Sequence, residues 1–496
     1  MISKKKGLWD TVSKNFANAF LGLIIFASTA AYAVEKKNID VVLVMDSTGS
    51  MKKTDPLSLR VPASKLFLSL LDKGDRAGLV SFDETATTLN PLVSLAGEGS
   101  KDTLLKATDM ITSTGLHTNL YEALNRGLEV LSSDRDAGRD RIIVLMSDGL
   151  MDTGEPEKDR ALVDRLGTEL TKKLVDNGTK VYAIAFTEQS DRQLLEKVSK
   201  QTTGFYNLAL TDRDFHVVFT SIFESLKAPD MLPITENGFF VDKSVEEVTI
   251  VATKDMSGTS IQLRAPDGKQ YSSKNRPPDT EWFVSGNFDM MTIKTPPEGE
   301  WEILFSSGKN NKAYIITNLN LQTNFNELYP LFGETLEIKA WLEREGKPIR
   351  EKEVLEKIDI SLELSVPDGG TTKLEPFYKG DGIFEKKIEL YTAGNYRLRI
   401  LADGKTFQRE KAASFKVGDV KESQEDLKMR QSLKKNETTA GQPPLQKDAG
   451  DKVNWIKIIS QFAIINLVVC AAVFAYLKRK HLTGLVKSVI KRKKEK

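Results

Sequence analysis

The pattern of hydrophobic and polar positions changes along this chain of 496 residues, and the changes separate it into blocks. The first block contains short, continuous apolar runs at 39–45, 77–82, 141–147 and 180–186. Such runs are typical of strands buried on both faces. Between them lie stretches with helical spacing, at 61–71, 104–111, 120–131 and 159–175. This alternation predicts an α/β domain with a doubly wound, mostly parallel sheet covered by helices on both faces.

A second pattern begins after residue 226, where short strand-like runs are separated by Pro and Gly turns. The tripeptide Pro-Asp-Gly at 266–268 recurs at 367–369, and Gly-x-aromatic at 299–301 recurs at 394–396. Each copy therefore places a turn before a strand that opens with glycine. The spacing predicts two β-sandwich domains related by duplication.

Both ends of the chain carry apolar segments that predict contact with a membrane. Residues 1–33 combine a basic start, an apolar stretch and a final Ala-Tyr-Ala, which is typical of a secretory signal peptide; an uncleaved anchor is the alternative. Residues 458–477 contain no charge, and a helix of 20 residues is about 30 Å long, enough to cross a bilayer. The basic tail 478–496 is then expected in the cytoplasm, in contact with anionic lipid.

The patterns together predict seven segments. They are a signal peptide at 1–33, the α/β domain at 34–228, β-sandwich domains at 229–321 and 322–418, a flexible tether at 419–457, a transmembrane helix at 458–477 and the tail at 478–496. This order is expected of a single-pass protein of a bacterial inner membrane whose bulk is periplasmic. A eukaryotic type I surface protein is the alternative.

Charge and composition narrow the function classes. The net charge is +2, from 71 basic and 69 acidic residues, but the tail carries +8 and the signal peptide +3, which leaves −9 on 34–457. An acidic exported body argues against nucleic acid as a partner. The single cysteine, Cys470, lies in the apolar span, so a disulfide scaffold, a cysteine zinc module and an iron–sulfur centre are excluded.

The candidate chemistry lies where three segments follow predicted strands or precede a predicted helix. Side chains there supply carboxylate and hydroxyl oxygens; the residues are Asp46, Thr48, Ser50, Thr118 and Asp148. The carboxyl ends of parallel strands meet at one edge of a sheet, so these oxygens are expected to converge. Oxygen ligands suit a hard divalent cation, with Mg²⁺ expected first and Mn²⁺ or Ca²⁺ as alternatives.

These residues resemble the metal-ion-dependent adhesion site of von Willebrand factor type A domains, which integrin I domains also have. The first three form the Asp-x-Thr-x-Ser motif, and Asp148 lies in Ser-Asp-Gly; the resemblance covers residues 38–228. It implies that all five residues contribute to metal binding and that the sixth position takes an Asp or Glu of a partner protein. One departure is His117, where many members have glycine. We expect an exposed loop histidine, although it could also narrow the approach or bond to the ligand.

The first sandwich is similar to the β-domain of calcium-activated chloride channel regulator proteins, through VDKSV at 241–245 and PEGEW at 297–301. Those proteins carry a His-Glu-x-x-His protease motif, and this sequence has none.

The sequence therefore predicts a membrane-anchored protein of adhesion or receptor type that binds partners through a divalent metal. We do not expect an enzyme, because a hydrolase triad needs a usable histidine. His481 lies in the tail, His117 in the metal loop, and His216 is expected on the solvent face of the amphipathic run 215–226. The alternative function is an inner-membrane assembly factor that works with a cytoplasmic AAA+ ATPase.

Overall fold

The structure is a computed structural model that describes residues 38–136, 138–186, 190–277 and 279–424, all of which belong to one compact unit. The predicted signal peptide, transmembrane helix and basic tail lie outside these residues, as does most of the tether. Within the described ranges, no helix is both long enough and apolar enough to cross a membrane.

The first domain contains a six-stranded sheet in the order β3-β2-β1-β4-β5-β6. Its strands are β1 Ile39–Asp46, β2 Arg76–Phe82, β3 Ala86–Ser94, β4 Asp140–Ser147, β5 Thr179–Phe186 and β6 Tyr206–Ala209. All pairs are parallel except β2 with β3. The apolar pattern did not predict strand β3, because only one of its 9 residues is buried. Every residue of β1 is buried, as expected for a strand covered on both faces.

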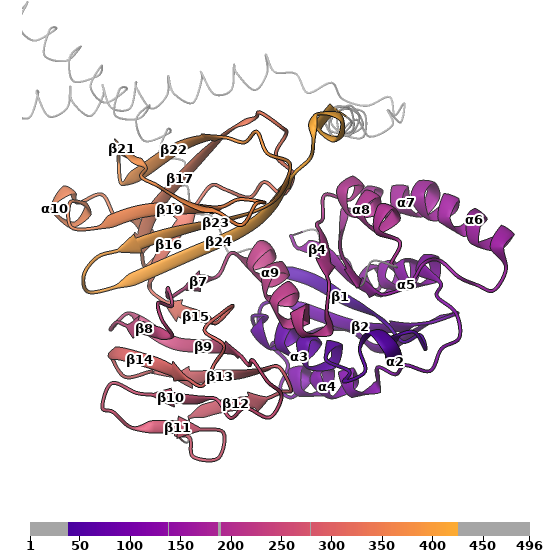
Figure 1. Cartoon of the computed structure of the whole chain (residues 1–496), viewed down its shortest axis with the longest axis horizontal. Coiled ribbons are helices and arrows are strands. Elements are labelled where there is room, and N and C mark those ends of the chain that lie inside the picture. Colours follow the sequence, from indigo (N-terminus) through magenta and orange to yellow (C-terminus); the bar gives the residue numbers. More distant parts are fainter. Residues whose placement is uncertain (1–37, 137, 187–189, 278, 425–496) are drawn as a thin grey trace, which may run out of the picture. The chain divides into compact units, whose positions relative to one another are not determined.

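Helices cover both faces of this sheet (Figure 1), so the prediction of a doubly wound α/β domain is confirmed. One face packs against α3 Arg60–Leu70, α4 Ser100–Ala107 and α9 Phe215–Lys227. The other packs against α5 Leu120–Ser132, α6 Pro156–Arg165, α7 Thr171–Asp176 and α8 Arg192–Gln201. Alternate β1 residues divide between the two cores: Val41 faces the first and Val42 the second. Short helical turns complete the domain, namely α2 Met51–Thr54, η1 Thr108–Met110, the π-helix η2 Leu166–Leu170 and η3 Asp212–Asp214.

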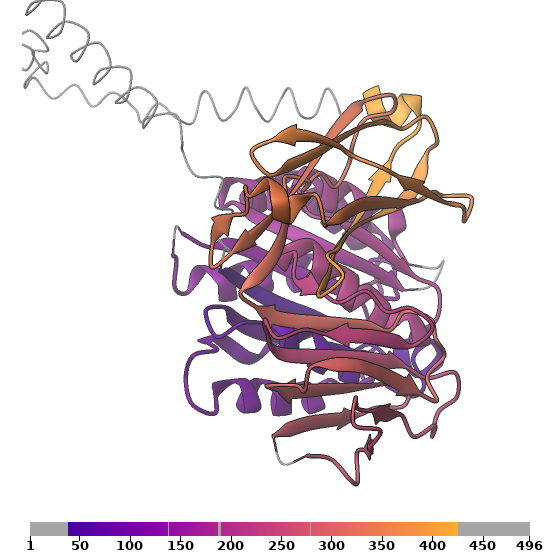
Figure 2. The same cartoon turned by 90° about the vertical axis from the view of Figure 1, so that its left-hand side faces the viewer.

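The rest of the described chain is almost entirely β-structure (Figure 2). The first sandwich is built from β8 Gly238–Val241, β9 Val245–Thr253, β10 Gln262–Arg264, β11 Gln270–Ser272, β12 Thr280–Val284, β13 Phe288–Lys294, β14 Gly299–Leu304 and β15 Lys312–Thr317. The second contains β16 Leu319–Thr323, β17 Thr335–Arg344, β18 Lys347–Pro348, α10 Lys352–Leu355, β19 Asp359–Ser365, β20 Thr371–Leu374, β21 Phe377–Gly380, β22 Ile383–Glu389, β23 Gly394–Asp403 and β24 Gln408–Val417. Each sandwich has its own apolar core.

The two sandwiches share one sheet. The order β12-β13-β9-β15-β7-β24-β23-β19-β20 is continuous, because the two-residue strand β7, Asp230–Met231, pairs with β15 on one side and β24 on the other. The smaller layers are β11-β10-β14-β8 in the first sandwich and β16-β17-β22-β21 in the second. Strand β16, which spans the expected boundary between 321 and 322, pairs with β17 of the second sandwich.

The internal repeat found in the sequence has the same local structure in both copies. In each, the Pro-Asp-Gly turn is closed by a backbone hydrogen bond from its glycine, of 2.9 Å at Gly268 and 3.0 Å at Gly369. The Gly-x-aromatic strand begins at a glycine with φ of 130° (Gly299) or 134° (Gly394), against which the turn proline packs. A β-carbon at either glycine would lie within 2.8 Å of that proline, so both positions require glycine.

Helix α9 lies between the first sheet and both sandwiches, and this position corrects the expectation for His216. The histidine is 2% exposed, not on a solvent face. Its Nδ1 accepts from the Asn287 amide at 3.1 Å, its Nε2 donates to Thr253 Oγ1 at 2.9 Å, and its ring stacks on Phe288. The helical spacing correctly predicts a two-faced helix, but the polar face is covered by the first sandwich.

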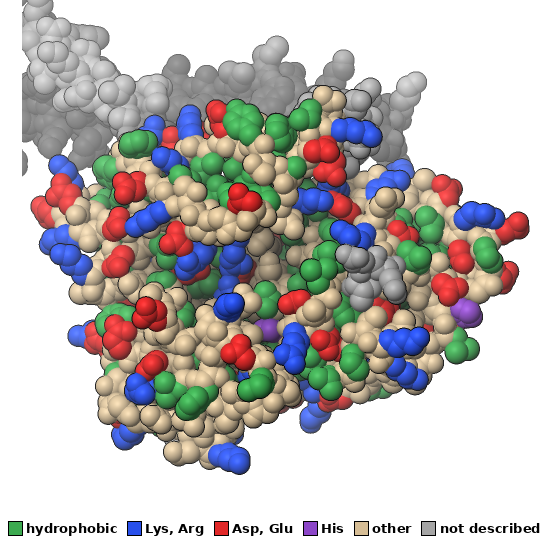
Figure 3. All heavy atoms as spheres, viewed as in Figure 1, with side chains coloured by type: hydrophobic (Ala, Val, Ile, Leu, Met, Phe, Trp, Pro, Cys, Tyr) green, Lys and Arg blue, Asp and Glu red, His purple; other side chains and the backbone are tan. Residues whose placement is uncertain are grey.

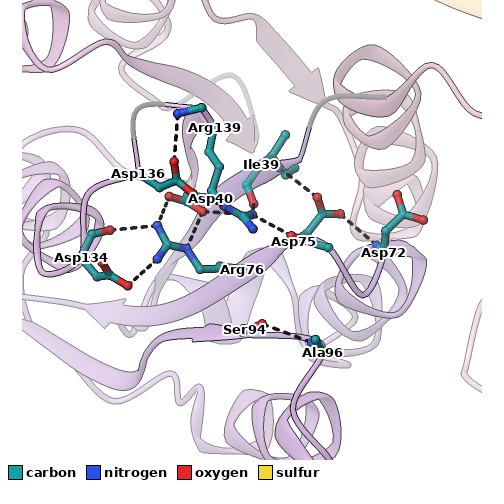
Figure 4. A network of polar contacts seen from close by, with 12 residues as sticks. Ile39, Asp40, Asp72, Asp75, Arg76, Ser94, Ala96, Asp134, Asp136 and Arg139 are labelled. Carbon is teal, nitrogen blue, oxygen red and sulfur yellow. Dashed lines mark hydrogen bonds and ion pairs between the residues drawn. The ribbon is translucent and has the colours of Figure 1, made fainter. Parts of the chain in front are cut away.

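Acidic and basic side chains are interspersed over the surface, as Figure 3 shows for one face. Figure 4 shows a network of them at the amino ends of β1 and β2. Arg76 bonds to both oxygens of Asp40, at 2.8 and 2.5 Å, and to Asp134 at 2.5 Å. Asp75 accepts from the Ile39 amide at 3.0 Å. These ion pairs fix the amino-terminal edge of the sheet, and the candidate site lies at the opposite edge.

Candidate metal site

Asp46 ends strand β1 and is fully buried. Its Oδ1 accepts from the Thr48 amide at 2.8 Å, a local bond that turns the chain sharply after the strand. Its Oδ2 accepts from the Ser147 hydroxyl at 2.7 Å, at the end of the neighbouring strand β4. The carboxylate is therefore held between two parallel strands at their carboxyl ends.

Hydroxyl groups connect this loop to Asp148. Thr48 Oγ1 and Ser50 Oγ are 2.8 Å apart, and Ser50 donates to Asp148 Oδ1 at 2.8 Å. The Thr54 hydroxyl, at the end of α2, donates to Asp148 Oδ2 at 2.5 Å. Ser50 donates to the carboxylate, so Thr48 is the donor in the first contact. The two aspartates and these hydroxyls form one cluster across residues about 100 positions apart in the chain.

Thr118 reaches the same cluster from a second loop. Backbone pairing joins Thr118 to Asp152, with N···O distances of 2.7 and 2.9 Å, and joins Thr48 to Gly115. A β-carbon built on Gly149 would lie 2.9 Å from Thr118 Oγ1, which places that hydroxyl against the Ser-Asp-Gly loop. The structure therefore brings together all five predicted site residues.

The electrostatics of the cluster fit a cation. Asp46 and Asp148 are 0% and 3% exposed, and among the described residues neither forms an ion pair with a basic side chain. Burial, followed by the negative charge of Asp148, raises the pKa of Asp46 to about 6. A pair of buried carboxylates without a counter-charge is costly, and a divalent cation would remove that cost. Carboxylate and hydroxyl oxygens are also the ligands that Mg²⁺ prefers.

Sequence reasoning missed two residues that orient the predicted ligands. Ser147 and Thr54 each donate a hydrogen bond to one of the aspartates. Ser147 could have been suspected from its place beside Asp148. Thr54 can be identified only from the structure, because its hydroxyl reaches Asp148 from the end of α2. Within the described residues, no group of three His, Cys, Asp or Glu side chains could hold a metal, so the candidate site depends on its hydroxyls.

His117 lies beside the cluster rather than in it. It is 36% exposed, its Nδ1 is 3.6 Å from Asp152 Oδ1, and its ring packs over Gly154. His117 is therefore a loop histidine, as expected, but it is half-buried rather than exposed. No described contact directs its ring toward Asp46 or Asp148.

Two stretches of the chain match known families. Residues 40–224 match the von Willebrand factor type A domain, and residues 226–317 match the hemicentin galactose-binding domain-like family. Residues 40–224 thus form the von Willebrand factor type A domain that the sequence led us to expect.

Curated relatives are similar over a longer stretch. The chain is 22% identical over 403 residues to calcium-activated chloride channel regulator 1 of Equus caballus, covering 73% of this chain and 41% of that protein. It is 23% identical over 181 residues to a von Willebrand factor A domain-containing protein of Dictyostelium discoideum, covering 36% and 18%. The chain thus spans about two fifths of the length of the regulator and less of the second relative.

Solved structures with some likeness include the von Willebrand factor type A protein from Catenulispora acidiphila. It is 14% identical with a TM-score of 0.33, covering 72% of this chain and 66% of that one. The vWF domain of the type V pili tip protein Mfa5 from Porphyromonas gingivalis is 14% identical with a TM-score of 0.31, covering 38% and 95%.

Proposed function

We propose that this protein binds a divalent cation at the cluster formed by its first domain and uses the cation to bind a carboxylate of a partner protein. The residues that would hold the cation are Asp46, Thr48, Ser50, Thr118 and Asp148. When bound, it supplies a positive charge and a coordination position that can accept an Asp or Glu side chain. Mg²⁺ is the first candidate, with Mn²⁺ or Ca²⁺ as alternatives.

The observation that carries this proposal is the pair of buried carboxylates without a basic partner. Asp46 and Asp148 are brought to the same sheet edge by β1 and β4 and are bridged by hydroxyls rather than by Lys or Arg. At the amino-terminal edge the acidic residues do have basic partners, as Asp40 does in Arg76. The two edges of the sheet thus differ: among the described residues, the buried carboxylates at the carboxyl-terminal edge lack the basic partner that Asp40 has, and a cation site requires such carboxylates.

We further propose that the protein is anchored in a membrane and presents the site outside the cytoplasm. The support is in the sequence: a signal-like stretch at 1–33, 20 uncharged residues at 458–477 and nine basic residues in the tail 478–496. A bacterial inner membrane, with the body in the periplasm, is the proposed location. The match of residues 40–224 to the von Willebrand factor type A domain supports an adhesion or receptor role, and we propose no catalytic activity.

The test is the thermal stability of the purified full-length protein with Mg²⁺, Mn²⁺ or a chelator, compared with an Asp46→Asn variant. A ligand that binds only the folded state stabilises it by about 2.7 kcal/mol at 100 times its Kd. We expect stabilisation of the wild type and none of the variant. Because the carboxyl of Asp46 has a raised pKa, its ionisation opposes folding at neutral pH, so the metal-free variant should be at least as stable as the metal-free wild type.

Asp152→Ala is the matched control, because this aspartate lies in the neighbouring loop with its side chain 58% exposed. It should keep the metal response. An unresponsive wild type, or an Asp46→Asn variant that is still stabilised by metal, would show that the cluster is not the cation site.

A further inference from the structure

The segments that carry the site residues also present large apolar side chains to solvent. Leu57 follows α2 and is 63% exposed, Leu116 lies two residues before Thr118 and is 82% exposed, and Leu150 lies two residues after Asp148 and is 56% exposed. We call these three residues the leucine collar. Burial of a leucine is favourable, so three exposed leucines at one candidate site suggest an apolar contact surface.

The backbone beneath two of these leucines is fixed by a buried ion pair. Arg60 and Asp55 are both fully buried, with 2.6 Å between Nη1 and Oδ2. Asp55 also closes the turn that carries Leu57, since its carbonyl accepts from the Ser58 amide at 3.0 Å. Arg60 reaches the second loop by donating to the Thr112 carbonyl at 2.7 Å. One arginine thus connects the Leu57 turn to the segment that leads to Leu116.

Other contacts hold Leu116 itself and the residue that precedes Leu150. The Leu116 amide donates to Glu84 Oε1 at 3.0 Å, next to the backbone pairing of Gly115 with Thr48. The Gly149 amide donates to Ser147 Oγ at 3.2 Å, and its carbonyl accepts from the Asp191 amide at 3.3 Å. The collar is therefore presented on an ordered backbone, which lowers the entropic cost of binding.

A groove continues from the collar at Leu150. Its volume is about 570 Å³, it runs between α6, η2 and α8, and its apolar lining includes Leu150, Met151, Val163 and Leu194. Charged side chains, among them Asp159, Asp164 and Lys197, also line the groove, so it offers a chain that leaves the metal site on the β4 side both apolar and polar contacts.

The charges around the leucine collar indicate what kind of partner segment would bind to it. Lys52 and Lys53 lie on α2, two and three residues after Ser50, and both are exposed. With the proposed cation bound, the centre of this surface would favour a negative side chain and the collar would favour apolar neighbours. An acidic residue without apolar neighbours would leave the leucines exposed to water.

We propose that the partner presents an Asp or Glu flanked on each side by large apolar side chains, and that the leucine collar selects this pattern. The inference rests on the proposed function, because the acidic residue is the group that the cation would bind. The leucine collar adds a second requirement, namely apolar side chains on both sides of the acidic residue. Burying one exposed leucine in the complex is expected to raise the affinity roughly tenfold.

The experiment uses the full-length protein and two synthetic peptides with one central Asp, flanked by Leu in one and by Ser in the other. Binding is measured by fluorescence anisotropy with saturating Mn²⁺ and with chelator. We expect the wild type to bind the Leu-flanked peptide at least about tenfold more tightly than the Ser-flanked peptide, and only with metal. The double variant Leu116→Ser/Leu150→Ser should lose this preference while keeping its stabilisation by Mn²⁺.

Met256→Ser is the control, because Met256 is 70% exposed in the first sandwich, outside the collar. It should keep the preference. Equal binding of both peptides by the wild type, a preference that survives in the double variant, or metal-dependent stabilisation without binding of either peptide would overturn the inference and leave the cation site intact. Failure of the wild type to respond to metal at all would instead contradict the proposed function.

Discussion

Thr54 shows how a residue outside the ligand motif can set the properties of the cluster. Its hydroxyl donates to Asp148 Oδ2, while Ser50 donates to Oδ1 of the same carboxylate. The two bonds together fix the plane of the Asp148 carboxylate. Groups that orient a metal ligand typically affect affinity by about 10- to 100-fold.

We therefore expect Thr54→Val, which keeps the side-chain shape but removes the hydroxyl, to weaken Mn²⁺ binding by about tenfold with little loss of fold stability. Titration calorimetry measures the change. Thr103→Val is a matched control, because the Thr103 hydroxyl donates to the Gly99 carbonyl at the start of α4, outside the cluster. Unchanged affinity in Thr54→Val would mean that Asp148 is oriented without it.

The five predicted site residues could be found from sequence because each lies beside an element with a strong local pattern. Asp46 and Asp148 end apolar runs, and Thr118 precedes an amphipathic helix capped by Asn119. Ser147 also ends an apolar run, but its bond to Asp46 crosses from β4 to β1, and Thr54 has no such pattern because its bond to Asp148 forms only in the folded chain. Local pattern therefore predicts the ligands but not the residues that orient them.

At the scale of elements, α9 is the part of the fold for which sequence reasoning gave the wrong environment. Its polar face carries Glu224, which is 2% exposed and accepts from Tyr314 at 3.0 Å and Arg397 at 2.8 Å, with Lys312 at 3.1 Å. Burial alone would raise the pKa of Glu224, but the charges of Lys312 and Arg397 outweigh it and lower the pKa to about 2. A pattern of alternating faces cannot distinguish solvent from a polar interface with another domain.

The same interface predicts acid sensitivity through His216. Burial lowers its pKa to about 4, below the value of 6.5 expected when the chain unfolds. The unfolded state therefore binds a proton first as the pH falls, and stability is lost progressively between about pH 6.5 and pH 4. From pH 7.5 to pH 5 the expected loss from this group is about 2 kcal/mol in the free energy of unfolding.

Denaturant unfolding at the two pH values, in the wild type and in His216→Gln, measures this contribution. The variant should be less stable at pH 7.5, because its contacts with Thr253 and Asn287 change, but its stability should fall less between the two values. The Asp and Glu side chains are the same in both proteins, and Arg and Lys stay protonated over this pH range, so the difference isolates the histidine. An identical fall in both would show that His216 is not buried in solution.

At the scale of the whole molecule, the continuous nine-stranded sheet joins the two sandwiches into one body. The sequence predicted two strand-rich domains and their repeat, but β7 contains only two residues and carries no readable pattern. Its pairing with both β15 and β24 could not be predicted, because it depends on strands far away in the chain.

Arg409 on β24 reinforces this junction. Its side chain is fully buried, bonds to Asp242 at 2.6 Å, and donates to the Leu319 carbonyl at 2.7 Å. Removing one member of a buried pair typically costs about 3–5 kcal/mol, because the other charge is left without a partner. We expect Arg409→Ala to lower the free energy of unfolding by this amount and the wild-type body to unfold in a single transition by calorimetry.

Arg264→Ala is the control for Arg409, since Arg264 pairs with Glu302 on the surface with both side chains more than 40% exposed. It should cost less than about 1 kcal/mol. Equal effects of the two substitutions, or separate transitions for the two sandwiches in the wild type, would argue that the shared sheet does not couple them.

The most direct test of the central claim is the position of a bound metal. Diffraction from crystals of the full-length protein grown with Mn²⁺, measured at the manganese absorption edge, locates the ion by its anomalous signal. We predict one strong peak in contact with oxygens of Asp46, Thr48, Ser50, Thr118 and Asp148, directly or through water. A peak elsewhere in the chain, or none at this edge of the sheet under saturating Mn²⁺, would contradict the account.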